Sequence, residues 1–441
     1  MARSLYICYF GVREPLVQTQ VLPYLRELLR EENGLGETGG SDRQMADEEQ
    51  GTLPGLVEKG KRRVPIEISL LTFEPQLGDD DLSELSVVRD RLAEEGIEWD
   101  WLPYHKRPSS LATAWDILRG AFYIWRRIGR YDILHGRVHV PTLMGAIARK
   151  FSRKTPKLLF DIRGFFPEEY VDAGIWPGGG YLYRGAKWVE RWLLKESDAF
   201  VVLTEKARDI LFPESRGTGR DRSGRPVEVI PCCVDLSKFP CADGEARNLR
   251  RGELGVNERR VIVYVGSFGG WYLTEELFSF FAAARNHDPK TYILVLSQRD
   301  TASIEERARR SGFANSDFGV FNLPPIEIHR YVSAADIAVS LIKNCYSKQA
   351  SSPTKIAEYL ACGVPIIANA GVGDMDELII SRGVGILVNE LGQEGYLEAL
   401  RKLELMGDVR DRCRETAEME FDLKSVGGAR YRILYDKILD T

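Results

Sequence analysis

The order of apolar and polar positions along the chain repeats one theme twice, a short apolar run followed by an amphipathic stretch. In the first half the apolar runs lie at residues 5–10, 66–73, 97–102, 131–135, 157–161 and 199–203. In the second half they lie at residues 261–266, 292–296, 318–323, 337–341, 364–368 and 386–388. Alternation of strand and helix is typical of a doubly wound parallel sheet. The pattern predicts an α/β protein with two tandem Rossmann-like domains, and ligands are expected at the carboxyl ends of their strands.

Two polar stretches interrupt this alternation. Residues 33–63 are rich in Gly, Glu, Asp and Gln, which predicts a flexible surface insertion. Residues 214–226 are polar and rich in Gly, and we expect them to be unstructured and to lie near the domain boundary. The predicted domains therefore span residues 1–218 and 219–419. A final helix over 420–441 is expected to cross back onto the first domain.

The composition is that of a soluble globular protein. The 441 residues are 44% hydrophobic and 28% charged, and a formal net charge of -5 gives no sign of nucleic-acid binding. Seven scattered cysteines without a CxxC pair indicate reduced thiols in a cytoplasmic protein. Five histidines show no metal-site spacing, and we expect no metal. We also find no signal peptide and no apolar run of 18 residues.

The stretch 351–378, SSPTKIAEYLACGVPIIANAGVGDMDEL, carries the most chemical information. Ser and Pro at 351–353 are expected to cap a helix over 355–362, and Gly363 ends it. A polar loop that feeds a helix N-terminus is an anion site, because backbone N–H groups and the helix dipole point at it. Glu358, one turn inside the helix, is placed to reach sugar hydroxyls. An ordinary capped αβ unit remains the alternative.

Together with IPCCVDLSKF (230–239), YVGSFGGWY (264–272) and HRYVSAADIAVSL (329–341), this stretch resembles a family 4 glycosyltransferase of the GT-B fold. The last third of the chain matches best. The resemblance implies that Glu358 and its loop hold the ribose and diphosphate of a UDP- or GDP-linked sugar. The implied donor-binding residues are Gly266, Ser267, Arg299, Ser351, Ser352, Pro353, Thr354, Lys355 and Glu358.

The sequence departs from the usual pattern of that family. The E-x7-E motif has its second Glu at 358, but its first position is Ala350. The contact that the first Glu makes near the donor sugar is therefore in doubt. The Arg and Lys that often follow the second-domain Gly loop are also missing, which leaves Lys348, Lys355 and Arg299 as candidate phosphate partners.

In the first domain, several candidate residues follow strand ends. His139 and Arg163, with Lys348 from the second domain, are the candidate catalytic residues. Loop residues expected to face the acceptor are Gly11, Arg13, Arg137 and Asp161. Structural roles remain open as alternatives: His139 as a hydrogen-bonded core histidine, Arg163 paired with Asp161 or Glu168, and Lys348 and Lys355 as solvated surface lysines.

The predicted reaction moves a sugar from the nucleoside diphosphate to a hydroxyl of a glycan, a lipid-linked acceptor or a small molecule. The resemblance implies that the domain over 1–218 binds the acceptor and the domain over 219–419 binds the nucleotide sugar. The resemblance implies retention of anomeric configuration and no metal or other cofactor. The acidic run 79–81 is explained by helix capping rather than by a metal site. Two alternatives remain, a sugar-nucleotide-binding protein without transferase activity and a GT-B-like sugar-nucleotide epimerase.

The acceptor side carries one further signal. Between residues 101 and 195 there are 17 Lys and Arg against 7 Asp and Glu. The run 112–130 mixes aromatic and aliphatic residues with arginines, and Trp176 and Trp188 follow it. A basic amphipathic helix of this kind predicts contact with the anionic inner face of a membrane and a glycan or lipid-linked acceptor. A core helix with a solvated face is the alternative.

Overall fold

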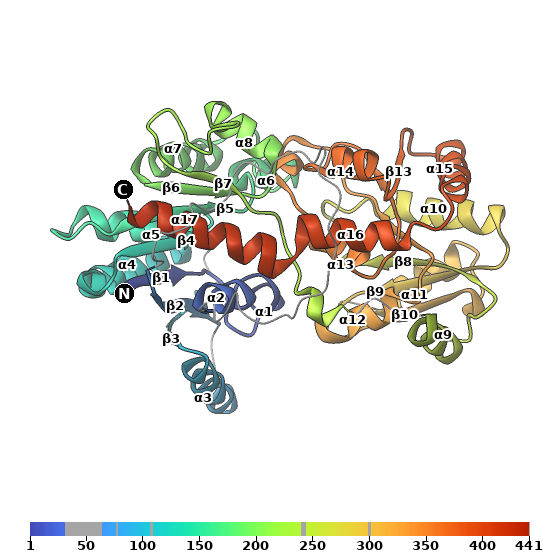
Figure 1. The fold of residues 1–441 in the computed structure, drawn as a ribbon, viewed down its shortest axis with the longest axis horizontal. Helices are drawn as coiled ribbons and strands as arrows, with labels where there is room; N and C mark the ends of the chain where they lie inside the picture. Colours follow the sequence, from blue (N-terminus) through green and yellow to red (C-terminus); the bar gives the residue numbers. More distant parts are fainter. Residues whose placement is uncertain (31–63, 76–77, 106–108, 240–243, 299–300, 441) are drawn as a thin grey trace, which may run out of the picture.

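A computed structural model describes residues 1–30, 64–75, 78–105, 109–239, 244–298 and 301–440. Two parallel sheets with helices on both faces form two domains, which lie end to end along the long axis of the molecule (Figure 1). The predicted fold class, two tandem doubly wound α/β domains, is confirmed. The predicted insertion 33–63 and Arg299 lie outside the described residues.

The first sheet has seven parallel strands in the order β3-β2-β1-β4-β5-β6-β7. They are β1 (Ala2–Ile7), β2 (Ile66–Glu74), β3 (Ile97–Pro103), β4 (Ile133–Arg137), β5 (Lys157–Ile162), β6 (Ala199–Val202) and β7 (Val227–Val229). The helices are α1 (Pro15–Gln20), α2 (Leu22–Leu29), α3 (Asp79–Glu94), α4 (Ser109–Arg127), α5 (His139–Lys150), α6 (Phe166–Asp172), α7 (Tyr181–Glu196) and α8 (Glu205–Leu211). The strand order reverses between β1 and β4, so loops diverge there and leave room for a ligand.

The second sheet has six parallel strands in the order β10-β9-β8-β11-β12-β13. They are β8 (Arg260–Val265), β9 (Thr291–Leu296), β10 (Phe318–Phe321), β11 (Ile337–Ser340), β12 (Ile366–Asn369) and β13 (Gly385–Val388). The helices are α9 (Gly244–Glu253), α10 (Thr274–His287), α11 (Thr301–Arg310), α12 (Pro325–Val332), α13 (Thr354–Ala361), α14 (Met375–Arg382), α15 (Gln393–Leu405) and α16 (Arg410–Phe421). The strand order of this sheet reverses between β8 and β11.

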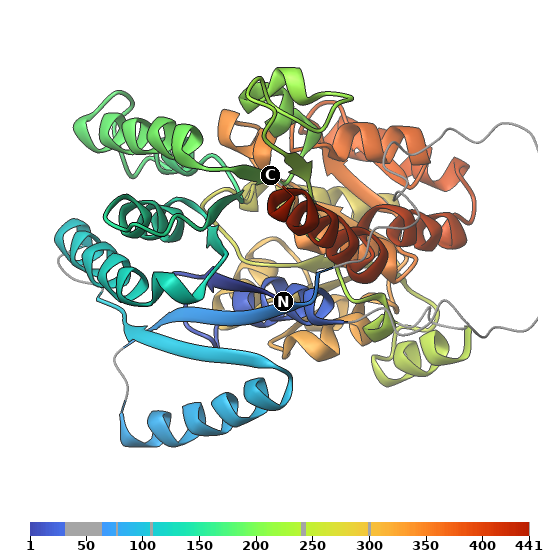
Figure 2. The ribbon, with the colours of Figure 1, turned by 60° about the vertical axis from the view of Figure 1, so that its left-hand side comes forward.

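The end of the chain returns to the first domain, as both ribbon views show (Figures 1 and 2). A π-helical turn (Leu423–Gly428) leads from α16 into α17 (Ala429–Leu439). The outgoing and returning chains pair where they cross: Val234 N donates to Phe421 O at 2.9 Å, and Leu423 N donates to Val234 O at 3.0 Å. Four side chains of α17 then enter the apolar core around β1 and α2, namely Tyr431, Leu434, Tyr435 and Ile438.

The helical segment after β1 divides into α1 and α2 at Val21, because Pro23 has no N–H to continue the helical bonding. Two local expectations were wrong. Residues 214–226 are ordered rather than structureless, since Asp221 accepts hydrogen bonds from the backbone of Ser223 and Arg225. The first sheet also extends past residue 218, because β7 pairs with β6.

Candidate functional site

Residues 346–353 lie between β11 and α13 and touch both domains; they are hereafter called the donor loop, after the donor-binding role that the sequence predicts for part of them. A 3-10 turn (Tyr346–Ala350) is followed by an extended segment that ends at Pro353, the N-cap of α13. No side chain caps this helix, so the expected Ser cap was wrong. Instead, Ser352 Oγ accepts a hydrogen bond from the backbone N–H of Cys232 in the interdomain linker, at 3.1 Å. The loop is therefore held by the linker and not by its own helix.

Lys355 lies in the first turn of α13 and is buried. Its ammonium sits over the rings of Tyr264 and Tyr272, 4.4 Å from each centroid, and Nζ has no hydrogen-bond partner among the described residues. A Cβ on Gly266 would come within 3.0 Å of Nζ, and the φ of 139° at Gly266 also favours glycine. Burial lowers the pKa of Lys355 to about 7, although the Glu358 carboxylate opposes the shift.

Glu358 follows one turn later on the same helix. Burial raises the pKa of its carboxyl to about 7, against the attraction of Lys355. Its side chain makes no hydrogen bond within the described part of the chain. Lys355 and Glu358, hereafter the donor-loop pair, thus place a cation and a carboxylate beside the Gly266 loop. Ser267 belongs to that loop, and its carbonyl accepts the Tyr264 hydroxyl at 2.5 Å.

Lys348 bridges the two domains. Its ammonium lies 3.2 Å from Glu169 Oε1 of α6 and 4.1 Å from the centroid of the Trp271 ring. The neighbouring Ser347 N donates to Asp172 Oδ2 at 2.9 Å. The expected solvated alternative for Lys348 does not fit this buried position.

Ala350, at the first position of the E-x7-E pattern, is 2% exposed and belongs to the apolar core of the first domain. The neighbouring Gln349 carbonyl accepts the Thr204 hydroxyl at 2.8 Å. A glutamate at 350 would bury its carboxylate among apolar side chains, which is costly without a partner. The alanine therefore fits the close approach of the domains at this point.

His139 begins α5 directly after β4. Its Nε2 lies 3.1 Å from Glu190 Oε2, its ring packs between Phe160 and Phe166, and its Nδ1 has no partner among the described residues. Val138, just before it, has a φ of 62°, which is strained for a β-branched residue. One ring nitrogen of His139 thus pairs with Glu190, and the other has no hydrogen-bond partner among the described residues.

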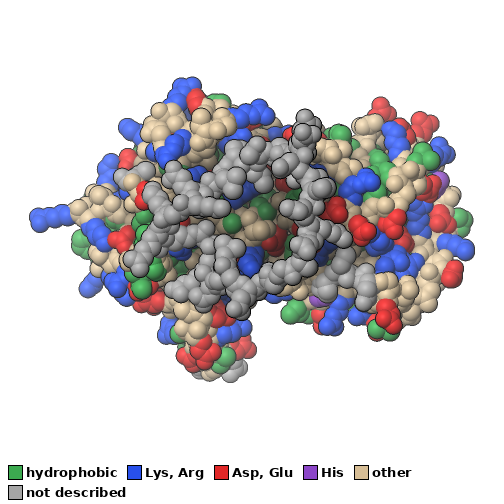
Figure 3. All heavy atoms as spheres, viewed as in Figure 1, with side chains coloured by type: hydrophobic (Ala, Val, Ile, Leu, Met, Phe, Trp, Pro, Cys, Tyr) green, Lys and Arg blue, Asp and Glu red, His purple; other side chains and the backbone are tan. Residues whose placement is uncertain are grey.

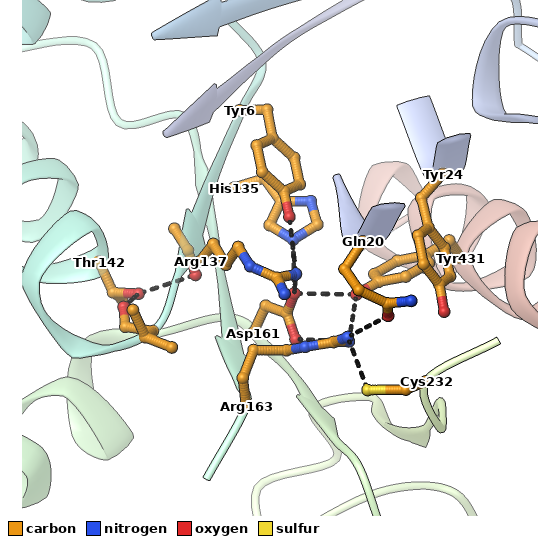
Figure 4. Close-up of polar contacts among 12 residues, drawn as sticks. Tyr6, Gln20, Tyr24, His135, Arg137, Thr142, Asp161, Arg163, Cys232 and Tyr431 are labelled. Atoms are coloured by element: carbon orange, nitrogen blue, oxygen red, sulfur yellow. Dashed lines mark hydrogen bonds and ion pairs between the residues drawn. The ribbon is translucent and has the colours of Figure 1, made fainter. Parts of the chain in front are cut away.

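Arg137, Asp161 and Arg163 lie deeper, in a polar cluster inside the first domain (Figure 4). Asp161 Oδ2 accepts the Tyr431 hydroxyl at 2.9 Å, and each guanidinium lies 3.7 Å from the carboxylate. Burial alone would raise the pKa of Asp161, but Arg163, the His135 ring and Arg137 lower it to about 2. Arg163 also reaches the sulfur of Cys232 at 3.6 Å. These contacts match the structural pairing of Arg163 with Asp161 that the sequence left open.

Gly11 and Arg13 form the loop after β1. A Cβ on Gly11 would lie 2.7 Å from Glu74 Oε2, and Glu74 Oε1 accepts the Val12 N–H at 2.7 Å. Arg13 turns outward and pairs with Asp81 at 2.6 Å and with Glu84 of α3. Arg13 is therefore held at the surface by α3.

Sequence reasoning missed the aromatic and acidic partners of the site. Tyr264, Trp271 and Tyr272 surround the two lysines, and their presence within YVGSFGGWY was the available signal. Glu169 and Glu190 gave no signal, because they meet their partners only in the folded chain. Among the described residues, no group of three or more His, Cys, Asp or Glu side chains is arranged to hold a metal ion.

The chain matches two protein families. Residues 246–419 match the family described as "Glycosyl transferases group 1", and residues 55–233 match "Glycosyl transferase 4-like domain". Alpha-maltose-1-phosphate synthase from Mycolicibacterium smegmatis is 26% identical over 250 residues, which is 54% of this chain and 60% of that protein. The match thus spans less than two thirds of this relative.

Solved structures share the architecture at low identity. HepE from Anabaena, in complex with UDP and glucose, has a TM-score of 0.65 at 13% identity and covers 99% of this chain and 100% of its own. A glycosyltransferase from Rickettsia africae has a TM-score of 0.64 at 16% identity, and the match covers 100% of this chain and 99% of that one. WaaG, a glycosyltransferase involved in lipopolysaccharide biosynthesis, has a TM-score of 0.60 at 14% identity, and the match covers 98% of this chain and 99% of that one.

Proposed function

Because this chain is a group 1 (GT4) glycosyltransferase of the GT-B fold, we propose that it moves a sugar from a nucleoside-diphosphate sugar to an acceptor hydroxyl. Transfer retains the anomeric configuration and needs no metal ion. The observation that supports this proposal is the donor-loop pair: a buried ammonium without a hydrogen-bond partner among the described residues, and a half-buried carboxylate one helical turn further on. A nucleoside diphosphate offers a partner to each.

Glu358 accepts hydrogen bonds from the ribose hydroxyls. Such charge-assisted bonds are short and strong, and the site is dry enough to favour them. A bound ribose leaves the carboxylate ionised, so donor binding lowers the pKa of Glu358 from its value of about 7 in the free protein.

Lys355 and the backbone around Ser351–Thr354 face the diphosphate, together with Gly266 and Ser267. A dianionic phosphate raises the pKa of Lys355 from about 7, so donor binding is accompanied by proton uptake at that amine. The fixed ammonium then stabilises the negative charge that develops on the leaving group as the glycosidic bond breaks. Lys348 adds a second cation from the other side of the donor loop.

The first domain supplies the acceptor side of the reaction. His139 is the residue that we assign to the reacting sugar, because its Nδ1 has no partner within the described residues and Glu190 fixes its orientation. The acceptor is a glycan or a lipid-linked sugar, and the protein works in the cytoplasm, in contact with the inner face of a membrane. The surface that supports this membrane contact is described in the next subsection.

The test is incubation with a panel of UDP- and GDP-sugars, with and without EDTA, while released nucleotide is measured. Slow hydrolysis of one donor that survives EDTA supports a metal-independent transferase. Tight binding without release supports the alternative of a sugar-nucleotide-binding protein. Conversion of the donor into an epimeric sugar nucleotide without release supports an epimerase. A thermal-shift screen identifies the base, since a ligand of the folded state raises the melting temperature.

A further inference from the structure

One helix of the first domain exposes an unusual row of large apolar side chains. Leu111, Trp115, Leu118 and Phe122 of α4 are 70%, 56%, 59% and 56% exposed. Their spacing of three or four residues places them on one face of the helix. The opposite face is buried in the core through Ile124. This helix is therefore apolar on both faces, whereas a surface helix normally turns a polar face to water.

The row continues onto the two neighbouring helices. Helices α4, α5 and α7 lie side by side on one face of the first sheet (Figure 2), with α5 in contact with both others. Phe151, just after α5, is 76% exposed, and its carbonyl accepts the Trp125 indole N–H at 2.8 Å. Tyr181, Leu182 and Trp188 of α7 are exposed as well. These side chains of α4, α5 and α7 form the three-helix face.

The charge on the three-helix face is positive. Arg126 lies over the Phe122 ring, 5.8 Å from its centroid. Other exposed cations on and beside the helices are Lys150, Arg153, Arg184, Arg191 and Lys195. Within the part of the chain that the structure describes, none of these cations is in an ion pair. Two of the carboxylates on these helices, Asp116 and Glu190, are buried and bonded inward. Blue Lys and Arg side chains accordingly outline the left-hand end of the molecule in Figure 3.

The second domain shows what an ordinary surface of this protein looks like. Its helices expose large apolar side chains singly, such as Leu249 on α9, Ile380 on α14 and Leu405 on α15. Scattered side chains of this kind are normal for soluble proteins, whereas a contiguous apolar surface indicates a binding partner.

We propose that the three-helix face docks onto an anionic phospholipid membrane, with its aromatic and aliphatic side chains in the headgroup region. Trp, Tyr and Phe favour that region because their rings are apolar while the indole and phenol groups stay hydrated. The surrounding arginines and lysines contact the lipid phosphates. Charge complementarity favours a lipid surface, since the face offers cations and apolar groups but few carboxylates to pair with a protein partner. No described helix is long and apolar enough to cross a bilayer, so the contact is peripheral.

Docking is tested by flotation of the full-length protein with vesicles of phosphatidylcholine containing about 30 mol% phosphatidylglycerol. The wild-type protein is expected to float at low salt, to float less with pure phosphatidylcholine, and to be released at about 0.5 M NaCl. The double variant Trp115→Glu/Phe122→Glu is expected to reduce the bound fraction about tenfold or more, because two exposed rings that would enter the headgroup region are replaced by charged groups. Arg184→Gln/Arg191→Gln is expected to weaken binding to anionic vesicles only.

The matched control is Leu405→Glu, which places the same charge on an exposed helix of the second domain and is expected to float like the wild type. Circular dichroism melting curves confirm that each variant folds. The proposal is overturned if the wild-type protein stays in the pellet, or if the control loses binding as much as the α4 variant. It is also overturned if light scattering shows a dimer that the α4 variant dissociates, because the face is then a contact between two copies. Nucleotide release from a soluble donor is measured separately, so the outcome is independent of the proposed reaction.

Discussion

Two regions of the molecule bury charged side chains and treat them in opposite ways. In the first-domain cluster of His135, Arg137, Asp161, Arg163 and Tyr431, the carboxylate accepts the Tyr431 hydroxyl and lies beside two guanidinium groups, and the pKa of Asp161 falls to about 2. In the donor-loop pair, burial dominates and brings the pKa of both Lys355 and Glu358 to about 7. The first region has its counterions already, and the second lacks them.

We propose that this difference separates a structural role from a binding role. A buried charge with partners stabilises one conformation, while a buried charge without partners costs free energy that a ligand can recover. Arg163 was a candidate catalytic residue in the sequence, yet its contacts with Asp161, Gln20 and Cys232 place it in the first class. Lys355 belongs to the second.

The largest effect is expected from Asp161→Ala. Removing the carboxylate leaves two buried guanidinium groups without a counterion, and the free energy of unfolding is expected to fall by about 3–5 kcal/mol. Urea denaturation measures it. Glu98→Ala, which breaks an exposed pair with Arg130, is the control and is expected to cost less than about 1 kcal/mol. Equal midpoints for the two variants would show that the cluster does not stabilise the fold.

Unlike Asp161→Ala, the variant Glu358→Ala is expected to impair donor binding and not the stability of the fold. Loss of two charge-assisted hydrogen bonds to the ribose reduces donor affinity and turnover about 100-fold, while the melting temperature of the free protein at pH 7 does not fall, because the burial cost of the Glu358 carboxylate is removed with it. Calorimetric titration and nucleotide release measure the two quantities. Glu377→Ala on α14, an exposed position, is the control. Unchanged donor affinity in the Glu358 variant would remove the donor-loop pair from the site.

Glu358 and Asp161 are expected to contribute to the pH dependence of stability with opposite signs. The folded-state pKa of Glu358 is about 7, above its unfolded value of about 4.3, so its contribution is complete below pH 4.3 and is lost as the pH rises to 7. Relative to Glu358→Gln, the wild type is expected to lose about 2 kcal/mol over that interval. Asp161, with a lowered pKa, contributes above about pH 4 and loses its contribution as the pH falls toward 2. Urea denaturation at a series of pH values tests both, and parallel curves for wild type and Glu358→Gln would contradict the first.

The smallest effect is expected from Tyr431→Phe, which removes the hydrogen bond to Asp161 and the longer one that Arg163 donates to the hydroxyl, while the ion pairs stay. The free energy of unfolding is expected to fall by about 1 kcal/mol. Tyr396→Phe is the comparison, since the Tyr396 hydroxyl makes no hydrogen bond among the described residues. A loss as large as that of Asp161→Ala would mean that the hydroxyl, and not the carboxylate, holds the cluster together.

The architecture was predictable from the sequence, because the hydrophobic periods of strands and helices are local patterns. The predicted apolar run occurs twelve times along the chain. The position of Glu358 and Lys355 on one helix was also predictable, since three residues on a helix make less than one turn. The aromatic neighbours of Lys355 were present in the sequence, but their packing around the amine depends on how β8 and α13 meet.

Contacts between distant segments were not predictable from local patterns. Asp161 and Tyr431 are 270 residues apart, and Arg163 and Cys232 meet only because the linker passes over β5. The Ser cap failed for a related reason, because Ser352 bonds to the backbone of Cys232 instead of to its own helix. Ala350 looked like a missing catalytic residue, and its burial in the core of the first domain appears only when the two domains are placed together.

The return of α17 to the first domain has a consequence for the order in which the protein is made. Tyr431, Leu434, Tyr435 and Ile438 complete a core whose other members, on β1 and α2, leave the ribosome first. The first domain thus waits for the last stretch of chain, while the whole second domain emerges and folds in between. Until α17 has been made, Asp161 lacks the Tyr431 hydroxyl and the apolar surface of α2 stays open. The first domain of the nascent chain is therefore expected to be the part most exposed to aggregation and proteolysis.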